Sequence, residues 1–261
     1  MTPWRTSVVR SDETSMHVRG YDIRDLMLHA GFVETVFLLH QGRLPSAGER
    51  RLLDAILVGV SDHGAGAPSC AVGRMVASSN RQSVAAAVGA GVLAIGDEHG
   101  GAGALCMEMI AEGLQLAARE SIPPDEAAAR TVEQRRARGQ RLPGFGHRVH
   151  TTDPRVKLLF AMEKESGIET KGAEFVEALE RHAAARIKPL PINIDGALAA
   201  ILHDLGFPAS AARFIFIIGR VAGITAEVAE EIAREKPMRV RIPIEYDGDP
   251  PKEFPESCPV R

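Results

Sequence analysis

Three short junctions in the sequence each combine glycine or proline with an ionisable side chain. These side chains are His99 in GDEHGGA, His147 in PGFGHRVH and Asp195 in PINIDG. Glycine lets backbone approach a ligand closely, and a histidine or aspartate at such a junction is a better catalytic candidate than one on a helix face. Two histidines and one carboxylate suit acid–base chemistry on a carbon acid. We therefore predict that His99, His147 and Asp195 are catalytic.

Each of these residues also has a simpler interpretation. Asp195 opens an apolar stretch and could be a helix N-cap, a role compatible with catalysis. His99 could be a satisfied loop histidine, and His147 could belong to a solvated basic turn. Arg220 is harder to explain simply, because it lies inside an apolar stretch. A buried guanidinium needs an anionic partner, either a structural salt bridge or a substrate carboxylate.

Most of the chain that must position these residues is predicted to be helical. Apolar residues recur at helical spacing from residues 22–41 through residues 210–234, which indicates about ten helices and an all-α fold. Asp153 and Pro154 are expected to start one helix as its N-cap and first turn. Residues 239–246 (RVRIPIEY) alternate like a strand, and Pro243 would confine that strand to a sheet edge. The segment after Gly248 is expected to lie against the surface or a partner.

Composition excludes several classes of protein. The chain has 261 residues, 45% of them hydrophobic and 25% charged, which is typical of a globular protein and not of a disordered one. A net charge of −3 argues against a nucleic-acid partner. The apolar run at 214–219 is far shorter than the ~20 residues of a membrane span. Three cysteines without metal-ligand spacing argue against a metal site and favour a cytoplasmic protein.

Several motifs, taken in order, resemble the citrate synthase superfamily. RGYDIRDL from residue 19, LLHQGRLP from residue 38, HGGA from residue 99 and GFGHRV…DPR from residue 144 match segments of that family. SDHG at 61–64, NIDG at 193–196 and GRVAG at 219–223 resemble the lyase module of ATP-citrate lyase and the stand-alone citryl-CoA lyases. His99 departs from that lyase module, which has an aromatic residue there, and resembles the synthases.

The resemblance implies a role for each catalytic candidate. Asp195 matches the carboxylate that exchanges a proton with the methyl group of acetyl-CoA. His99 matches the donor to the enolate oxygen, and His147 matches the group that hydrogen-bonds the ketone of oxaloacetate. The family fold has a large all-α domain, here residues 1–103 and 206–261, and a smaller inserted helical domain, here residues 104–205. The cleft between the domains is expected to close and exclude water.

The resemblance also implies the binding residues. His63, Arg155, Arg220 and Arg241 match residues that bind substrate carboxylates, and Arg74 matches a family arginine assigned to the same set. Arg241 is expected to enter the site of a partner subunit, which implies a homodimer with a shared active site. The loop that contains Gly144, Phe145, Gly146 and Arg148 is the expected wall for coenzyme A. The thioester is a substrate, and no bound cofactor is expected.

The leading functional prediction is a citryl-CoA lyase, which cleaves citryl-CoA to acetyl-CoA and oxaloacetate. The first alternative is a citrate synthase-type condensing enzyme that acts on oxaloacetate or a related 2-oxo acid. The second is a non-catalytic paralogue or a subunit of a larger complex. The sequence leaves open the direction of the reaction, the acyl group and the 2-oxo acid.

Overall fold

The computed structural model describes residues 2–146 and 153–254. Within them the fold is all-α, as predicted, apart from one small sheet near the amino terminus. The helices are α1 (Ile23–His29), α2 (Phe32–Gln41), α3 (Ala47–Val60), α4 (Pro68–Ser79), α5 (Val84–Leu93), α6 (Ala102–Glu120), α7 (Pro124–Ala137), α8 (Pro154–Glu165), α9 (Lys171–Arg186), α10 (Ile194–Asp204) and α11 (Ala211–Arg234).

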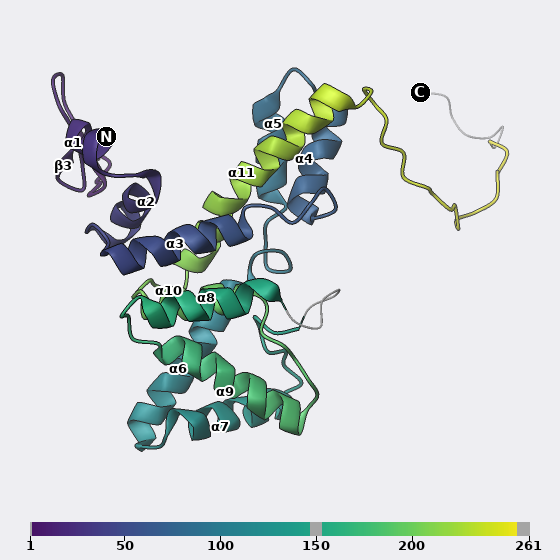
Figure 1. The fold of residues 1–261 in the computed structure, drawn as a ribbon. Helices are drawn as coiled ribbons and strands as arrows, with labels where there is room; N and C mark the ends of the chain where they lie inside the picture. Colours follow the sequence, from purple (N-terminus) through teal and green to yellow (C-terminus); the bar gives the residue numbers. More distant parts are fainter. Residues whose placement is uncertain (1, 147–152, 255–261) are drawn as a thin grey trace.

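The helices form two groups with α3 between them (Figure 1). One group consists of α4, α5 and α11, which pack against one another, and α3 contacts α11. The other group consists of α6 to α10, in which α10 contacts α6, α8 and α9. Helix α8 also contacts α3, and α11 contacts α6 and α10, so the two groups meet along α3 and α11.

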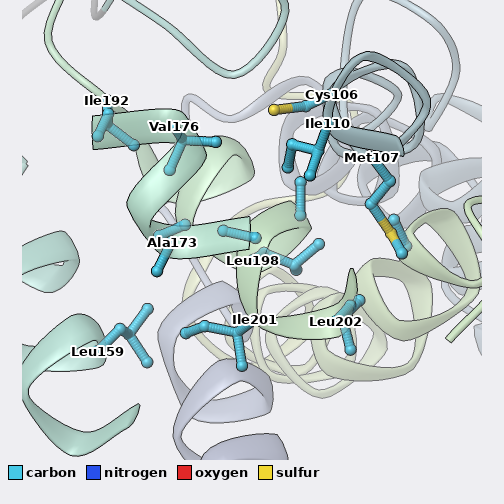
Figure 2. Close-up of a cluster of buried hydrophobic side chains, with 14 of the residues drawn as sticks. Cys106, Met107, Ile110, Leu159, Ala173, Val176, Ile192, Leu198, Ile201 and Leu202 are labelled. Carbon is cyan, nitrogen blue, oxygen red and sulfur yellow. The ribbon is translucent and has the colours of Figure 1, made fainter. Parts of the chain in front are cut away.

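Helix α10 is the centre of the second group. Every residue from Gly196 to Leu202 is buried, because this stretch is apolar on all sides and therefore suits a helix enclosed by others. Figure 2 shows Leu198 among Met107 and Ile110 of α6 and Val176 of α9. The packing fixes the amino-terminal end of α10, which carries Asp195.

The segment at 22–41 differs from its prediction as one continuous helix. Asp22 caps α1 through a bond from the Arg24 N–H, as an N-cap should. The chain is then extended at Ala30 and Gly31, where α1 stops and α2 begins. Glycine disfavours the helical interior by about 1 kcal/mol relative to alanine, which allows the break.

The strand predicted at 239–246 is wrong. These residues are exposed and belong to neither a helix nor a strand, since no neighbouring strand in the described structure offers a pairing edge. The sheet instead joins β1 (Val9–Ser11), β2 (Met16–Val18) and β3 (Tyr21–Asp22), antiparallel in the order β1-β2-β3. Strands of two or three residues are too short to show alternation. No described helix has both the length and the apolar character required to cross a bilayer.

Candidate functional site

Asp195 lies in the first turn of α10, and Asn193 is the residue that caps this helix. The Asn193 Oδ1 accepts bonds from the backbone N–H groups of Asp195 (3.0 Å) and Gly196 (3.2 Å). The interpretation of Asp195 as the N-cap is therefore wrong, and its carboxylate is not used to cap the helix. Burial raises the pKa of Asp195, while the positive charges of Arg155 and Arg220 oppose that rise. The raised pKa favours the protonated form of this carboxyl group more than in an ordinary aspartate, which suits it to proton exchange.

The loop at Gly144–Gly146 is fastened to the segment that leads into α10. The Gly146 N–H donates to the Pro191 carbonyl (2.7 Å), and the Asn193 N–H donates to the Gly144 carbonyl (3.0 Å). The Asn193 side-chain amide also donates to the Gly146 carbonyl (2.9 Å). Gly144 has φ of +83°, and a Cβ there would lie 2.7 Å from the Gly196 Cα. Glycine is therefore required at residue 144.

This bonding places Gly144, Phe145 and Gly146 next to the start of the helix that carries Asp195. The ring of Phe145 packs against the main hydrophobic core. The predictions for His147 and Arg148 lie outside the described residues.

His99 is held in a tight turn between α5 and α6. Its backbone exchanges two bonds with Gly96, at 2.9 and 3.2 Å. Gly101 permits the turn, because a Cβ there would lie 2.6 Å from the Asp97 Cα. The His99 Nε2 lies 2.9 Å from the Ser69 hydroxyl, and the ring meets Phe216 edge to face at 5.8 Å.

The surroundings of His99 favour a neutral imidazole. Burial of the ring is the main cause that lowers the pKa of His99, and the positive charges of Arg220 and His63 lower it further. A neutral ring with one N–H can donate a hydrogen bond to a developing oxyanion without first losing a proton.

Arg220 is buried in α11, with only 3% of its surface exposed. Its Nε donates to the Val60 carbonyl (2.9 Å), and its Nη1 donates to the Ser69 hydroxyl (3.3 Å). The guanidinium also lies 4.9 Å from the centre of the Phe216 ring. No carboxylate of the described residues forms a salt bridge with it, so the structural salt bridge considered above is not found there. Burial accordingly lowers the pKa of this guanidinium.

Arg155 approaches the same helix end from α8. Its Nη1 donates to the Gly59 carbonyl (2.8 Å), the neighbour of the carbonyl that Arg220 uses. Its Nε and Nη2 bind both oxygens of Asp153, at 2.9 and 2.7 Å. Asp153 also caps α8, as the sequence predicted. The last carbonyls of a helix lack intrahelical partners and carry partial negative charge, so the end of α3 holds two guanidinium groups together.

His63 follows α3 in an exposed turn. The Asp62 Oδ1 organises this turn by accepting bonds from the N–H groups of His63 (2.6 Å) and Gly64 (3.0 Å) and from the Cys70 thiol (3.3 Å). Because the charge of His63 lowers the pKa of His99, the two histidines lie within electrostatic range of each other.

Two of the predicted binding residues lie apart from this cluster. Arg74 forms ion pairs with Glu227 and Glu231, further along α11. Arg241 is exposed in the segment that follows α11. The structure therefore brings His99, Arg155, Asp195 and Arg220 into one electrostatic neighbourhood and leaves Arg74 and Arg241 outside it.

Sequence reasoning missed Ser69 and the capping role of Asn193. Asn193 could have been found, because asparagine before an apolar run is a favoured N-cap. The contacts of Ser69 join α4, the His99 turn and α11, and no local pattern predicts such a contact.

The site as a whole provides a carboxyl group with a raised pKa, a neutral imidazole and two fixed cations, from Asp195, His99, Arg155 and Arg220 respectively. Such a set can move a proton at carbon beside a carbonyl and bind carboxylates.

Comparison with known proteins fits this chemistry. Residues 46–241 match the family described as "Citrate synthase, C-terminal domain". The chain belongs to the citrate synthase family.

Solved structures and curated relatives that resemble this chain carry the names of several related enzymes. The citryl-CoA lyase of Hydrogenobacter thermophilus is 34% identical, with a TM-score of 0.89 over 97% of both chains. An ATP citrate lyase of Methanosaeta concilii shares the fold, with a TM-score of 0.76 over 95% of this chain and 42% of that one, at 17% identity. The citrate synthase of Haloferax volcanii is 29% identical over 82% of this chain and 54% of its own length. This chain thus spans about half the length of such curated relatives.

Proposed function

We propose that this member of the citrate synthase family is a citryl-CoA lyase, which cleaves citryl-CoA to acetyl-CoA and oxaloacetate. One observation carries the proposal: a citryl-CoA lyase is 34% identical to this chain over 97% of both lengths. The motifs SDHG and NIDG, which resemble the lyases, support the same activity.

The proposed reaction starts with Asp195 protonated, and its raised pKa supports this state. His147, whose role rests on the family resemblance, accepts the proton of the citryl hydroxyl. The bond between the hydroxyl-bearing carbon and the thioester CH2 breaks as the ketone of oxaloacetate forms. The electron pair of that bond passes to the enolate of acetyl-CoA, and His99 donates a hydrogen bond to its oxygen. Asp195 then gives its proton to the CH2 carbon, which becomes the methyl group.

The substrate carboxylates need fixed cations, and we assign Arg155 and Arg220 to them, with His63 as a further contact. The two guanidinium groups are held at adjacent carbonyls before any substrate binds. Preorganised donors of this kind lose little freedom when a carboxylate arrives. We assign the wall of the coenzyme A site to Gly144, Phe145, Gly146 and Arg148, with the thioester as substrate and no resident cofactor.

We further propose a homodimer in which Arg241 completes the partner's site. Several side chains of the segment that carries Arg241 are apolar and exposed, among them Ile242 (65%) and Ile244 (89%). A second copy of the chain would remove this apolar surface from water. We also propose, from the family resemblance, that residues 104–205 form the smaller domain. Light scattering of the purified protein tests the dimer: a monomer at assay concentration would contradict it.

Replacement of Asp195 by asparagine tests the mechanism. Asparagine keeps the shape but cannot exchange a proton at carbon, so turnover of citryl-CoA should fall roughly 100- to 10,000-fold, the usual contribution of general acid–base catalysis. Binding of the thioester, measured by calorimetry, should remain. Asp54→Asn, on the exposed side of α3, is the matched control. Turnover by Asp195→Asn at the rate of the control would refute the assignment.

A citrate synthase-type condensing enzyme is the second candidate, because curated relatives carry that name and because His99 resembles the synthases. Two assays separate the candidates. Citryl-CoA with NADH and malate dehydrogenase detects released oxaloacetate, and acetyl-CoA with oxaloacetate and a thiol reagent detects free coenzyme A. Oxaloacetate in the first assay without thiol in the second identifies a lyase. Strong thiol release identifies a synthase, and silence in both favours a subunit that needs a partner.

A further inference from the structure

Arg74 takes part in a buried network of charges at the far end of α11. Its Nη1 lies 2.5 Å from the Glu227 carboxylate, and its Nη2 lies 3.0 Å from the Glu231 carboxylate. The exposed fractions of the three side chains are 12%, 10% and 0% respectively. Charges this deeply buried are costly to leave unpaired, so each depends strongly on its partners.

Glu231 has a second cationic partner, Arg239. The Arg239 Nε donates to Glu231 Oε1 (2.8 Å), and its Nη2 donates to Oε2. This bidentate pair is the strong form of a charge-assisted hydrogen bond. One buried carboxylate on α11 therefore joins a guanidinium from α4 to a guanidinium from the segment after α11.

The backbone on the amino-terminal side of Arg239 is bound to the helices, whereas the backbone after it is exposed. Met238 has φ of +57°, and its N–H donates to the Ser78 carbonyl of α4 (2.9 Å). Arg81 donates to the carbonyls of Ile232 and Glu235, which end α11. Beyond Arg239, residues 240–254 are exposed, and Figure 1 shows this segment running away from the helices. Among the described residues, Arg239 is thus the last ion-paired contact between this segment and the helical body.

The network lies away from the substrate-binding candidates. Glu227 and Arg220 are seven residues apart on α11, which corresponds to about 10 Å along the helix. Arg74 bonds Glu227 and Glu231. Both glutamates therefore lie at least this distance along α11 from Arg220.

We infer that Arg74 is a positioning residue, which acts through Glu231 and Arg239 to fix the direction of the segment at 239–254. The consequence for Arg241 follows from chain geometry. Arg241 follows Arg239 by two residues, so their Cα atoms can lie at most about 7 Å apart. The anchored position of Arg239 therefore limits where Arg241 can reach. The first step, in which Arg74 fixes the segment, does not depend on the proposed function. The second step, which concerns the reach of Arg241 into a site, rests on it.

Chymotrypsin tests the first step, since it cleaves after Tyr246, an exposed aromatic residue of the segment that is followed by Asp247. Arg74→Met and Arg239→Met should each raise the rate of cleavage at this bond roughly tenfold, as expected for loss of a hydrogen bond between charged groups. Mass spectrometry of the fragments identifies the site, and circular dichroism checks that the helices remain. Arg234→Met is the matched control, because Arg234 forms an exposed ion pair with Glu230 on the same helix.

The double variant Arg74→Met/Arg239→Met completes a cycle. If Arg74 acts through Glu231 and Arg239, the double variant should be cleaved no faster than the faster single variant. Effects that multiply, or an Arg74→Met rate equal to that of Arg234→Met, would overturn the inference. Should Arg74→Met fail to fold, Arg239→Met and Glu231→Gln provide the comparison, and rates equal to that of the control would overturn it equally.

Kinetics separate this inference from the proposed function. With citryl-CoA, Arg74→Met should raise KM as Arg239→Met does, by a smaller factor than Arg241→Ala, with little change in kcat. A fall in kcat for Arg74→Met with unchanged cleavage by chymotrypsin would make Arg74 a substrate ligand and refute the positioning role. Absence of turnover in the wild-type protein would count against the proposed function only, and the cleavage rates would still decide the role of Arg74.

Discussion

Replacement of Glu163 by glutamine should reduce the loss of stability that this protein undergoes as pH rises from about 4.5 to about 8. Glu163 lies in α8 with no exposed surface, and no donor of the described residues reaches either carboxylate oxygen. Burial, followed by the charge of Asp204 and a hydrogen bond to it, raises the pKa of Glu163 to about 8. Glu177 adds to the rise, and Lys164 opposes it.

Asp204, whose negative charge raises the pKa of Glu163, is held in place by several hydrogen bonds. Its carboxylate accepts bonds from the N–H groups of Gly172 and Ala173 at the start of α9, and it lies 3.1 Å from the His203 Nδ1. The raised pKa of Glu163 therefore favours its protonated form. Loss of that proton would leave two negative charges buried side by side.

The magnitude follows from proton linkage. The pKa of Glu163 is about 8 in the folded protein, against a reference value of 4.5. Between these two values the folded state binds more protons than the unfolded state, so stability falls as pH rises and the loss is complete above pH 8. Each pKa unit corresponds to about 1.36 kcal/mol, so the loss is at most about 4 to 5 kcal/mol. Glutamine stays neutral and can donate to Asp204, so the variant should escape most of this loss.

Urea unfolding at pH 5, 7 and 9 measures the effect. Glu163→Gln should be close to wild type at pH 5 and more stable by several kcal/mol at pH 9, with a melting temperature about 10 °C higher. Glu165→Gln, on the exposed side of the same helix, is the control and should follow wild type throughout. If the difference in stability between Glu163→Gln and wild type does not change with pH, the raised pKa of Glu163 is refuted.

Two further substitutions test the Ser69 contacts and the packing of α6 against α9. Ser69→Ala removes the hydroxyl that bonds both His99 and Arg220, so steady-state turnover should fall roughly 10- to 100-fold while Ser79→Ala, at the end of the same helix, stays near wild type. Equal turnover by the two variants would show that the Ser69 hydroxyl is not needed for catalysis. Gly113→Ala places a Cβ against the Phe175 ring and should lower the unfolding free energy by about 1 to 3 kcal/mol in urea. Gly89→Ala in α5 meets nothing within 4 Å and should instead gain up to ~1 kcal/mol; stabilisation by both would contradict the packing.

The sequence predicted the fold class and the family because both depend on signals that extend over long stretches of the chain. Apolar periodicity is repeated over each helix, and the family motifs occur in a fixed order. Local capping was predictable in part: Asp153 starts α8 as expected, whereas Asn193 and not Asp195 starts α10. Two candidates within three residues cannot be separated by cap preference alone, since both residue types are favoured.

The contacts between distant segments could not be predicted. Arg74 and Arg220 look alike in sequence, each an arginine within a helix, yet one is paired with carboxylates and the other is not. The difference arises from position along α11: Arg220 lies level with the end of α3, whereas Glu227 and Glu231 lie about two and three turns further along the same face, where Arg74 of α4 reaches them. The alternation at 239–246 was misleading for a related reason, because a strand exists only where a second strand can accept its hydrogen bonds.

If Arg155 and Arg220 bind the substrate carboxylates as proposed, the adjacent carbonyls at the end of α3 determine how selectivity for substrates could be altered. Because Gly59 and Val60 are consecutive in a regular helix, the anchors of Arg155 and Arg220 are separated by a distance that helix geometry fixes. Substitution of neighbouring side chains would change the surroundings of the two guanidinium groups but would hardly change the distance between the Gly59 and Val60 carbonyl oxygens that hold them. Acids with a longer or shorter span between carboxylates would therefore have to be accommodated by the turn at His63. Attempts to redesign the enzyme for other acids should vary that turn and leave α3 unchanged.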